Sequence, residues 1–239
     1  MAQALVTGAT SGIGRAIALA LHGAGHEVIA LGRNAAALQG LSALGMQTRQ
    51  VDLADAAELT TALNGLAPDI LVNNAGVMPP LGNFCDADLA DIDQAINVNL
   101  RSVLALTHAI APGMRARGHG HIFFTGSTAG HAPFANLAVY CATKAAIGGF
   151  AQALRLDLAP HNVRVTEIVA GRVETALYST LLPPEARAAM YAGNSAVQPE
   201  DVAAMLLAVL ALPQSVDVAR FDILPTYQGV ATGTPKKEA

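Results

Sequence analysis

Short apolar runs alternate along the chain with segments of helical periodicity. A strand, a helix and a second strand form a right-handed crossover, which makes neighbouring strands parallel. Strands buried on both faces by such helices read as continuous apolar runs. The pattern predicts one α/β domain, 1–239, with a doubly wound parallel sheet of seven strands and helices on both faces. The predicted strands are 4–6, 26–31, 47–51, 70–72, 122–125, 163–169 and 219–224, and the predicted helices are 12–24, 88–117, 137–158, 199–212 and two that begin at residues 34 and 55.

One long stretch, 176–193, leads into no strand and contains Pro183 and Pro184. It leaves the edge of the sheet at which parallel strands end, where ligands of open α/β sheets bind. We interpret it as a lid over a ligand. A surface helix pair that serves only subunit packing is the alternative. The end of the chain, 230–239, is expected to be a flexible tail.

Composition argues against several classes of partner. The chain is 52% hydrophobic and 13% charged, with a formal net charge of −4. It shows no basic stripe, so nucleic acid is not an expected partner. Apolar runs are interrupted before the roughly 20 residues needed to cross a bilayer, and Met1 leads directly into an apolar strand without a basic leader. We expect a cytoplasmic protein that is not bound to a membrane.

Cysteine and histidine spacing predicts neither disulfides nor a metal site. Cys85 and Cys141 are too few for a disulfide framework. His119 and His121 flank glycines in an expected turn, and none of the seven histidines has the spacing of metal ligands.

A glycine-rich segment, TGATSGIG at 7–14, joins the first strand to the first helix. Gly8 permits a tight turn, Gly12 lets a pyrophosphate approach the backbone, and Gly14 allows close helix packing. The helix N-terminus adds free N–H groups and a positive dipole end. This placement predicts a Rossmann-type dinucleotide site, whose expected contacts also include Thr10, Ser11 and Ile13.

The residue after the second strand distinguishes the two nicotinamide nucleotides. A carboxylate there binds the ribose 2′-hydroxyl and repels a 2′-phosphate. This chain has no acid at 31–34, and Arg33 offers a charged fork that suits a phosphate. We therefore predict NADP(H), with NAD and a merely solvated Arg33 as the alternative. Asp52 is expected to accept from the adenine amino group or to cap the next helix.

Six motifs stand in a fixed order, and together they resemble the short-chain dehydrogenase/reductase family from Thr7 to about Leu224. They are TGATSGIG, Asp52-Leu53, NNAG at 73–76, Asn99 in NVNL, Ser127 in TGSTAG and YCATK at 140–144. The resemblance implies that Tyr140 is the acid/base, Ser127 bonds the substrate oxygen, Lys144 binds the nicotinamide ribose and Asn99 holds a water. It also implies cofactor contacts at Leu53, Asn74, Ala75, Gly76, Val173 and Thr175, besides Tyr140 and Lys144 themselves.

The spacing of Tyr140 and Lys144 supports this chemistry independently. Residues four apart share one face of a helix. A phenol has an ordinary pKa of about 10, and a nearby ammonium is expected to lower that pKa. Taken singly, each residue could instead have a purely structural role. Tyr140 and Lys144 could be a pair on a helix surface, Ser127 a polar residue at a strand end, and Asn99 a helix amide that faces solvent.

The chain also departs from the family pattern. Ala170 stands where the family usually has proline, which leaves the local backbone less restricted. Reductases of the family that act on carrier proteins have basic residues where Gly118 and His161 stand, so a carrier-bound substrate is disfavoured. PEDV at 199–202 and the ending at 220–225 resemble NADP-dependent dehydrogenases of small 3-hydroxy acids, serine-like alcohols and assorted carbonyls.

We therefore expect an NADP-dependent oxidoreductase, a homotetramer or homodimer, that interconverts a carbonyl and a primary or secondary alcohol of a small molecule. The alternatives are an NAD-dependent dehydrogenase of a sugar alcohol or aromatic alcohol, and a non-catalytic dinucleotide sensor. A sensor would need no proton relay, so the presence of Asn99, Ser127, Tyr140 and Lys144 together argues against the sensor. The expected substrate pocket comprises Met78, Ser127, His131, Phe134, Tyr140, Gly171, Arg172, Leu177 and Tyr178, with Glu174 as a further wall.

Overall fold

A parallel sheet forms the middle layer of the computed structural model, which describes residues 1–179 and 181–227. In this part of the chain the seven strands follow the order β3-β2-β1-β4-β5-β6-β7, and every neighbouring pair is parallel. The predicted doubly wound sheet is confirmed. The strands are β1 (Gln3–Thr7), β2 (Glu27–Gly32), β3 (Gln47–Gln50), β4 (Ile70–Asn73), β5 (Gly120–Thr125), β6 (Val163–Ala170) and β7 (Arg220–Ile223). The predicted tail, 230–239, and Thr180 of the predicted lid lie outside the described residues.

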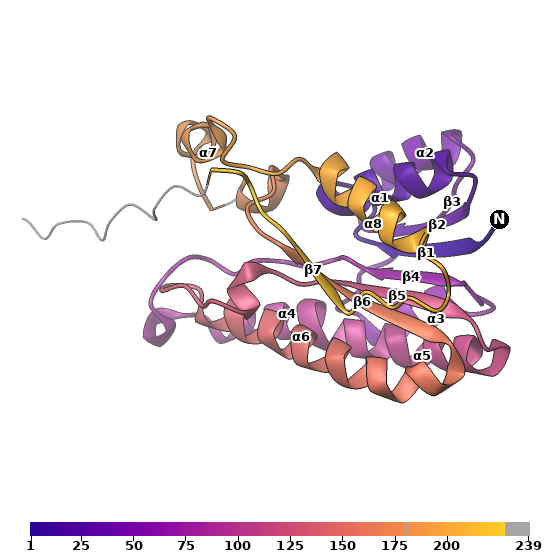
Figure 1. Cartoon of the computed structure of the whole chain (residues 1–239). Helices are drawn as coiled ribbons and strands as arrows, with labels where there is room; N and C mark the ends of the chain where they lie inside the picture. The colour runs from indigo at the N-terminus through magenta and orange to yellow at the C-terminus, as the bar shows by residue number, and fades with distance from the viewer. Residues whose placement is uncertain (180, 228–239) are drawn as a thin grey trace, which may run out of the picture.

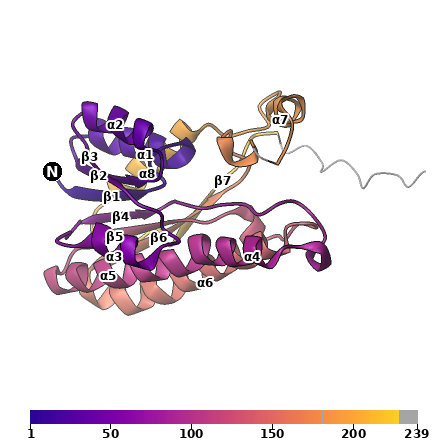
Figure 2. The same cartoon turned by 180° about the vertical axis from the view of Figure 1, so that it is seen from behind.

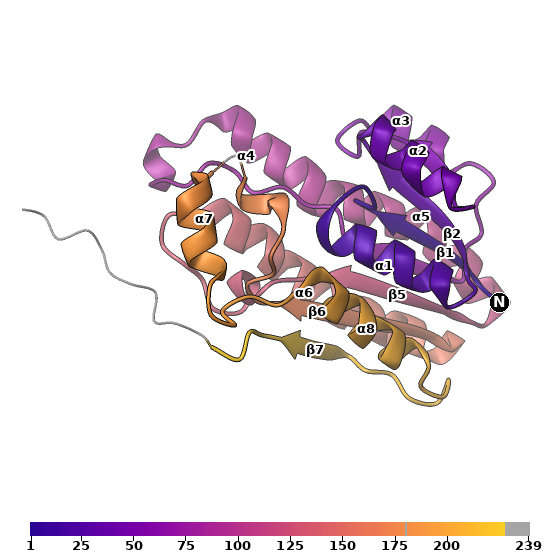
Figure 3. The ribbon, with the colours of Figure 1, turned by 90° about the horizontal axis from the view of Figure 1, so that it is seen from above.

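Helices cover both faces of the sheet (Figures 1 and 2). One face carries α1, α2 and α8, and the other carries α3, α5 and α6. Figure 3 shows α1 and α8 side by side, although they come from opposite ends of the chain. The helices are α1 (Gly12–Gly23), α2 (Ala35–Ala43), α3 (Ala56–Leu63), α4 (Leu89–Ile96), α5 (Ser102–Arg117), α6 (Ala138–Leu158), α7 (Pro184–Tyr191) and α8 (Pro199–Leu210). None of the described helices is both long enough and apolar enough to cross a membrane.

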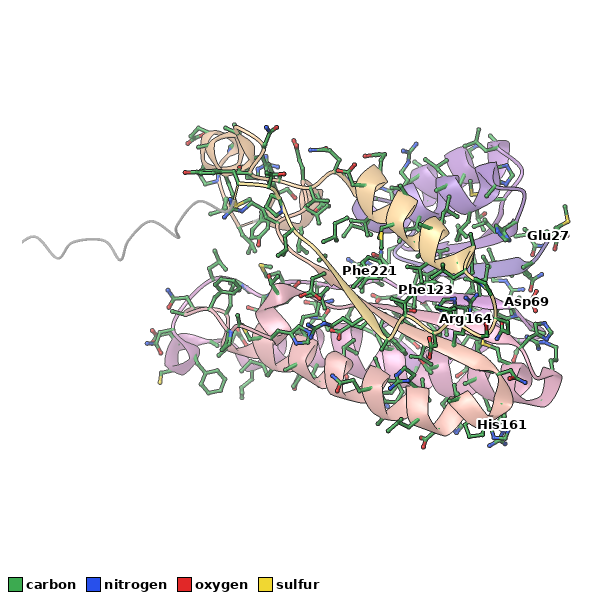
Figure 4. The ribbon with its side chains drawn as sticks, viewed as in Figure 1. Glu27, Asp69, Phe123, His161, Arg164 and Phe221 are labelled. Carbon is green, nitrogen blue, oxygen red and sulfur yellow. The ribbon has the colours of Figure 1, made fainter. Side chains whose placement is uncertain are left out.

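Two separate apolar cores follow from the alternation of side chains along each strand. In β5, Phe123 packs on the α1 and α8 side, whereas Ile122 and Phe124 pack on the α5 and α6 side. Phe123 and Phe221 belong to the same core and are marked in Figure 4. Because both faces are covered, the central strands β1, β4 and β5 are largely apolar, whereas β3 at one edge of the sheet is polar and partly exposed.

The two ends of the sheet differ in what they carry. Glu27, Asp69 and Arg164 mark the amino ends of the strands, opposite the end at which α7 projects (Figure 4). The segment expected to be a lid contains a short 3-10 helix, η5 (Ala176–Tyr178), and then α7. The loops and segment 176–193 therefore gather at the carboxyl end, where ligands of such sheets bind.

Two predicted elements need correction. The single helix expected over 88–117 is divided, because a π-helical turn, η2 (Asn97–Arg101), separates α4 from α5. His121 lies inside β5 and not in the turn before it, where it is buried, stacks on Phe123 and bonds Thr166. Both differences arise from tertiary contacts that local periodicity does not show.

Candidate active site

The glycine-rich loop between β1 and α1 folds back on itself. Gly8 has a φ of +65°, in the left-handed region that favours glycine. A Cβ on Gly14 would lie 2.3 Å from the carbonyl oxygen of Gly8 and 2.4 Å from Nδ2 of Asn74. The loop therefore needs glycine at these positions, and no side chain covers its backbone at Gly8 and Gly14. Gly12 faces Thr175, since a Cβ there would lie 3.0 Å from the Thr175 methyl carbon.

The first turn of α1 is free to bind an anion. Its N-cap residue, Ser11, makes no side-chain capping bond, and no acidic residue stands in the turn. N–H groups at a helix N-terminus have no partner within the helix and carry the positive dipole end. Together with the bare loop, this arrangement fits the pyrophosphate of a dinucleotide. Thr10 and Ile13 lie in the same stretch and are partly buried.

The carboxyl ends of β2 and β3 offer two groups for the adenosine side of a nucleotide. Arg33 is exposed directly after β2, and the side chain of Gln50 donates to its main-chain carbonyl. Asp52 accepts from the backbone N–H of Ala54 at 3.0 Å, so it closes a turn. The cap of α3 is instead Asp55. The predicted capping role of Asp52 is therefore wrong, while Leu53 is buried beside it.

The loop after β4 is tied to β1 by one hydroxyl. Oγ1 of Thr7 accepts from the N–H groups of Asn74 and Ala75, both at 3.0 Å, and donates to the carbonyl of Val72. The Asn74 amide also donates to the carbonyl of Thr7 at 3.1 Å. Gly76 follows and is exposed. The NNAG segment is thus held directly beside the glycine-rich loop.

Asn99 lies in the π-helical turn and is 1% exposed, which excludes the solvent-facing alternative. Its Oδ1 accepts from the Val77 N–H at 2.8 Å, and its Nδ2 donates to the Val77 carbonyl at 2.8 Å. Nδ2 also lies 3.3 Å from Oγ1 of Thr143, which donates to the main-chain carbonyl of Tyr140. π-turns of this kind occur frequently at functional sites. Here the turn links the loop after β4 to the helix that carries Tyr140.

Tyr140 is 7% exposed near the start of α6. Burial raises the pKa of its phenol above the ordinary value, and hydrogen bonding to Ser127 lowers that pKa by a smaller amount. Tyr178 and Cys141 raise the pKa further. The predicted net lowering of this pKa by Lys144 is therefore wrong for this arrangement, because desolvation outweighs the other effects. A phenol with a raised pKa keeps its proton at neutral pH.

Lys144 is buried one helical turn after Tyr140, with Nζ 5.8 Å from the centroid of the Tyr140 ring. Its ammonium donates to the Thr125 carbonyl at 2.8 Å. Burial lowers the pKa of Lys144 to about 8, and the charge of Glu167 acts in the opposite direction. A Cβ on Gly76 would lie 3.7 Å from Nζ, so the ammonium also reaches the NNAG loop.

Segment 176–193 approaches Tyr140 through Tyr178, whose charge would raise the pKa of Tyr140. Burial raises the pKa of Tyr178 itself, and Arg172 lowers it. Arg172 donates to the carbonyls of Met190 at 3.2 Å and Ser195 at 3.5 Å. It therefore ties the chain after β6 to the end of α7.

The remaining pocket residues divide into those near Tyr140 and those turned elsewhere. Met78 packs against the cluster that contains Tyr140. Phe134 is 48% exposed, and Gly171 is bonded to β7, where its N–H donates to the Ile223 carbonyl at 2.9 Å. Leu177 is partly buried in η5, Glu174 is exposed and accepts from Gln198, and His131 contacts the carboxylate of Glu167.

On the cofactor side of the lid, Val173 is buried and bridges to Val197, while Thr175 caps η5. An open pocket of about 570 Å³ lies between the glycine-rich loop and the lid. Its lining includes Gly12, Thr175, Tyr191, Arg15 and Arg187. The last two residues were not predicted from the sequence.

Three further residues of the site were missed, and the sequence held a signal for two of them. Thr143 is part of the same helical face as Tyr140, three positions later. Glu167 is an acid in a strand whose residues are all buried, and a fully buried acid is unusual. Thr7 gave no such signal, because its role depends on the position of the loop after β4.

Comparison with known proteins agrees with this geometry. A family model described as short chain dehydrogenase matches residues 2–186. An uncharacterized short-chain type dehydrogenase/reductase of Sinorhizobium fredii is 49% identical over 229 residues, which covers 95% of this chain and 92% of that protein. The NADP-dependent 3-hydroxy acid dehydrogenase of Escherichia coli is 37% identical over 238 residues, which covers 95% of this chain and 96% of that protein.

A solved structure is similar over nearly the whole chain. The closed form of a serine dehydrogenase complexed with NADP+ superimposes with a TM-score of 0.91 at 34% identity and covers 99% of this chain and 100% of that one. The fold, the order of the motifs and the matched family model agree. The chain belongs to the short-chain dehydrogenase/reductase family of oxidoreductases.

Proposed function

We propose that this protein is an NADP-dependent dehydrogenase that interconverts a small 3-hydroxy acid, or a closely related hydroxyl compound, and the corresponding carbonyl compound. One observation carries the proposal: Tyr140, Ser127 and Lys144 converge at the carboxyl end of the sheet, beside the bare glycine-rich loop. When bound, NADP(H) supplies or accepts the hydride. The chain itself supplies the proton and the positions of the reacting groups.

Each member of the group has a distinct task in this proposal. The Tyr140 phenol donates its proton to the substrate oxygen during reduction and accepts it during oxidation. Its raised pKa favours the protonated form, which is the form that reduction requires. Ser127 bonds the same substrate oxygen, and Lys144 holds the ribose hydroxyls of the nucleotide. Asn99 fixes the loop after β4 against the helix that carries Tyr140.

The choice of NADP(H) is supported by Arg33 and by the relatives. Arg33 is exposed, its guanidinium forms no ion pair among residues 1–179 and 181–227, and no acid follows β2. The names of the Escherichia coli relative and of the solved structure both include NADP. An arginine at this place favours the nucleotide that carries a 2′-phosphate.

An acidic substrate is supported by Arg172. Its charge lowers the pKa of Tyr178 and Tyr191, so it lies close to both, and Tyr178 in turn approaches Tyr140. Within the described residues no carboxylate forms an ion pair with it. A substrate carboxylate would complete the pair, which fits the substrate class in the names of the relatives.

The test is an assay of NADPH oxidation and NADP+ reduction with 3-hydroxy acids, their keto acids, and the methyl esters of both. Wild type should prefer the acids. Tyr140→Phe should lose at least about 100-fold in kcat, since positioned acid–base catalysis contributes about 10²- to 10⁴-fold. Tyr227→Phe, which alters an exposed tyrosine, is the matched control.

Arg172→Leu should raise KM for the acids and leave KM for the esters nearly unchanged. Binding of NADPH without turnover of any substrate would instead favour a dinucleotide sensor. Equal use of acids and esters by the wild type would contradict the acidic substrate while leaving the dehydrogenase assignment intact.

A further inference from the structure

A buried carboxylate lies close to the active site, on the side of the sheet that α6 covers (Figure 1). Glu167 is in the middle of β6 and is 1% exposed. Its Oε1 is 3.0 Å from Nε2 of His131, whose side chain is 30% exposed. Among the described residues Oε2 has no hydrogen-bond partner. Such a half-satisfied carboxylate is unfavourable in a protein interior unless an opposite charge lies nearby.

Two glycines make room for this carboxylate. A Cβ on Gly126, directly before Ser127, would lie 2.4 Å from Oε1 of Glu167. A Cβ on Gly148 would lie 3.2 Å from the same oxygen. Gly148 is four residues after Lys144 and therefore lies on the same face of α6. The carboxylate thus occupies a space between the loop that carries Ser127 and the helix that carries Lys144.

The carboxylate has two basic neighbours, His131 at 3.0 Å and the ammonium of Lys144, which lies beyond ion-pair distance but within reach of its charge. Burial lowers the pKa of Lys144 to about 8, and Glu167 is the charge that raises it. A base with a pKa of about 8 is roughly 90% protonated at pH 7, whereas a pKa about one unit lower would leave roughly half of the molecules neutral. The charge of the carboxylate therefore favours the protonated form of Lys144 near neutral pH.

Other ionisable groups stand around this pair. Arg220 is the register partner of Glu167 on β7, but its Nε lies 2.9 Å from Oδ1 of Asp222 and both side chains are largely exposed, so water screens them. The other ionisable groups that face the pair from the elements packed against it are His131 after η3, Tyr140 and Cys141 of α6, and Tyr178 of η5.

We propose that Glu167 is a positioning residue for Lys144: its buried carboxylate keeps the ammonium charged and directed at the cofactor side of the active site. This inference rests on the role that the proposed function gives to Lys144. Glu167 itself touches neither substrate nor nucleotide in this proposal, and it acts only through the lysine.

The composition of the chain permits a direct test, because its three lysines are Lys144, Lys236 and Lys237. Lysine labelled with ¹³C at Cε gives few NMR signals, and Lys144→Arg assigns the signal of Lys144. We expect the Lys144 signal of the wild type to titrate near pH 8. In Glu167→Gln the midpoint should fall by about one pH unit or more, the shift typical of losing a nearby opposite charge.

Two matched variants separate charge from shape. Glu167→Asp keeps the charge and should titrate close to wild type. Glu27→Gln removes an exposed carboxylate at the far end of the sheet (Figure 4) and should leave the midpoint unchanged. The pH profile of NADPH affinity, measured by fluorescence, should show the same displacement in Glu167→Gln as the NMR titration does.

An unshifted Lys144 midpoint in Glu167→Gln would overturn the inference. The apolar variant Glu167→Met guards against misfolding, since replacing a buried ion by an apolar group of similar size is often tolerated. Recovery of neither variant as folded protein would make Glu167 a structural residue and overturn the inference as well. The NMR titration needs no nucleotide, so a wild type that binds no NADPH refutes the proposed function alone.

Discussion

Both polar atoms of the Asn99 side chain bond the backbone of Val77, Oδ1 to its N–H and Nδ2 to its carbonyl, each at 2.8 Å. One side chain thereby replaces the two backbone partners that a strand neighbour would offer. It joins the π-helical turn to the loop after β4. The position of that loop, which carries Gly76 next to Lys144, depends on this amide.

Asn99→Ala should therefore reduce both stability and activity. Leaving a buried N–H and a buried carbonyl unsatisfied costs about 1–3 kcal/mol each, so the free energy of unfolding should fall by roughly 2–6 kcal/mol. Urea denaturation measures this change. Asn97→Ala alters the same π-turn at a side chain for which the structure shows no hydrogen bond, and it is the control. Equal stability of the two variants would contradict the structural role of Asn99.

Arg33→Ala should weaken NADPH binding and leave NADH binding unchanged. Loss of a charge-assisted bond worth about 1.5–3 kcal/mol corresponds to roughly a 10- to 150-fold rise in Kd. Fluorescence titration with both nucleotides measures the ratio. Arg115→Ala removes an exposed charge from the end of α5 and should change neither affinity. A wild type with equal affinities for the two nucleotides would argue against this role of Arg33.

Introducing an acid at position 32 is a less direct test of nucleotide choice. A Cβ on Gly32 would lie 2.6 Å from Cγ2 of Thr10, so the glycine-rich loop would have to shift. Arg33→Ala avoids this effect, because the Arg33 side chain is exposed.

Stability should depend on pH through His121. Burial, and to a lesser extent Arg164, lowers the pKa of this imidazole from 6.5 to about 3. The folded state thus keeps His121 neutral, whereas the unfolded state binds a proton below about pH 6.5. The contribution of neutral His121 to the free energy of unfolding is fully present above pH 6.5 and is lost as pH falls toward 3. Over that range the free energy of unfolding falls by about 1.4 kcal/mol per pH unit.

His121→Gln should remove that slope between pH 6 and pH 4, whatever it does to stability at pH 7. His161→Gln, at an exposed site after α6, should retain it (Figure 4). Chemical denaturation at a series of pH values gives both curves. Parallel curves for His121→Gln and wild type would show that another group controls acid unfolding.

Amide hydrogen exchange should identify the lid. Pro184–Tyr191 has no buried residue, and Arg172 holds its end through two backbone carbonyls. We expect α7 to exchange rapidly in the free protein and more slowly with NADPH and substrate bound. Arg172→Leu should weaken this protection. Exchange in α7 that stays the same on saturation would leave it as a packing element, the alternative reading of this segment.

Much of the fold was readable from the sequence because strands and helices alternate strictly. The buried strands β5 and β6 lie where their β-branched and aromatic runs predicted them, and Gly8 and Gly14 have the backbone roles expected of them. Tyr140 and Lys144 share a helix face as their spacing required. These features depend on residues close together in the chain.

The features that sequence reasoning missed depend on residues far apart. The π-turn is stabilised by bonds from Asn99 to a residue 22 positions away, and Glu167 meets a histidine 36 positions away. The direction of the Tyr140 pKa shift depends on burial, which four-residue spacing does not reveal. The predicted homotetramer or homodimer stays a prediction that analytical ultracentrifugation would test.

The packing of α8 against α1 has a consequence for how this protein is made. Ile17 and Leu21 of α1 share a core with Val202 and Leu206 of α8. A ribosome releases α1 well before α8, the helix that covers it, because most of the sheet lies between them in the sequence. Until then the apolar face of α1 is open to chaperones and to other nascent chains. The glycine-rich loop at the start of α1 thus reaches its final packing only after α8 has been made.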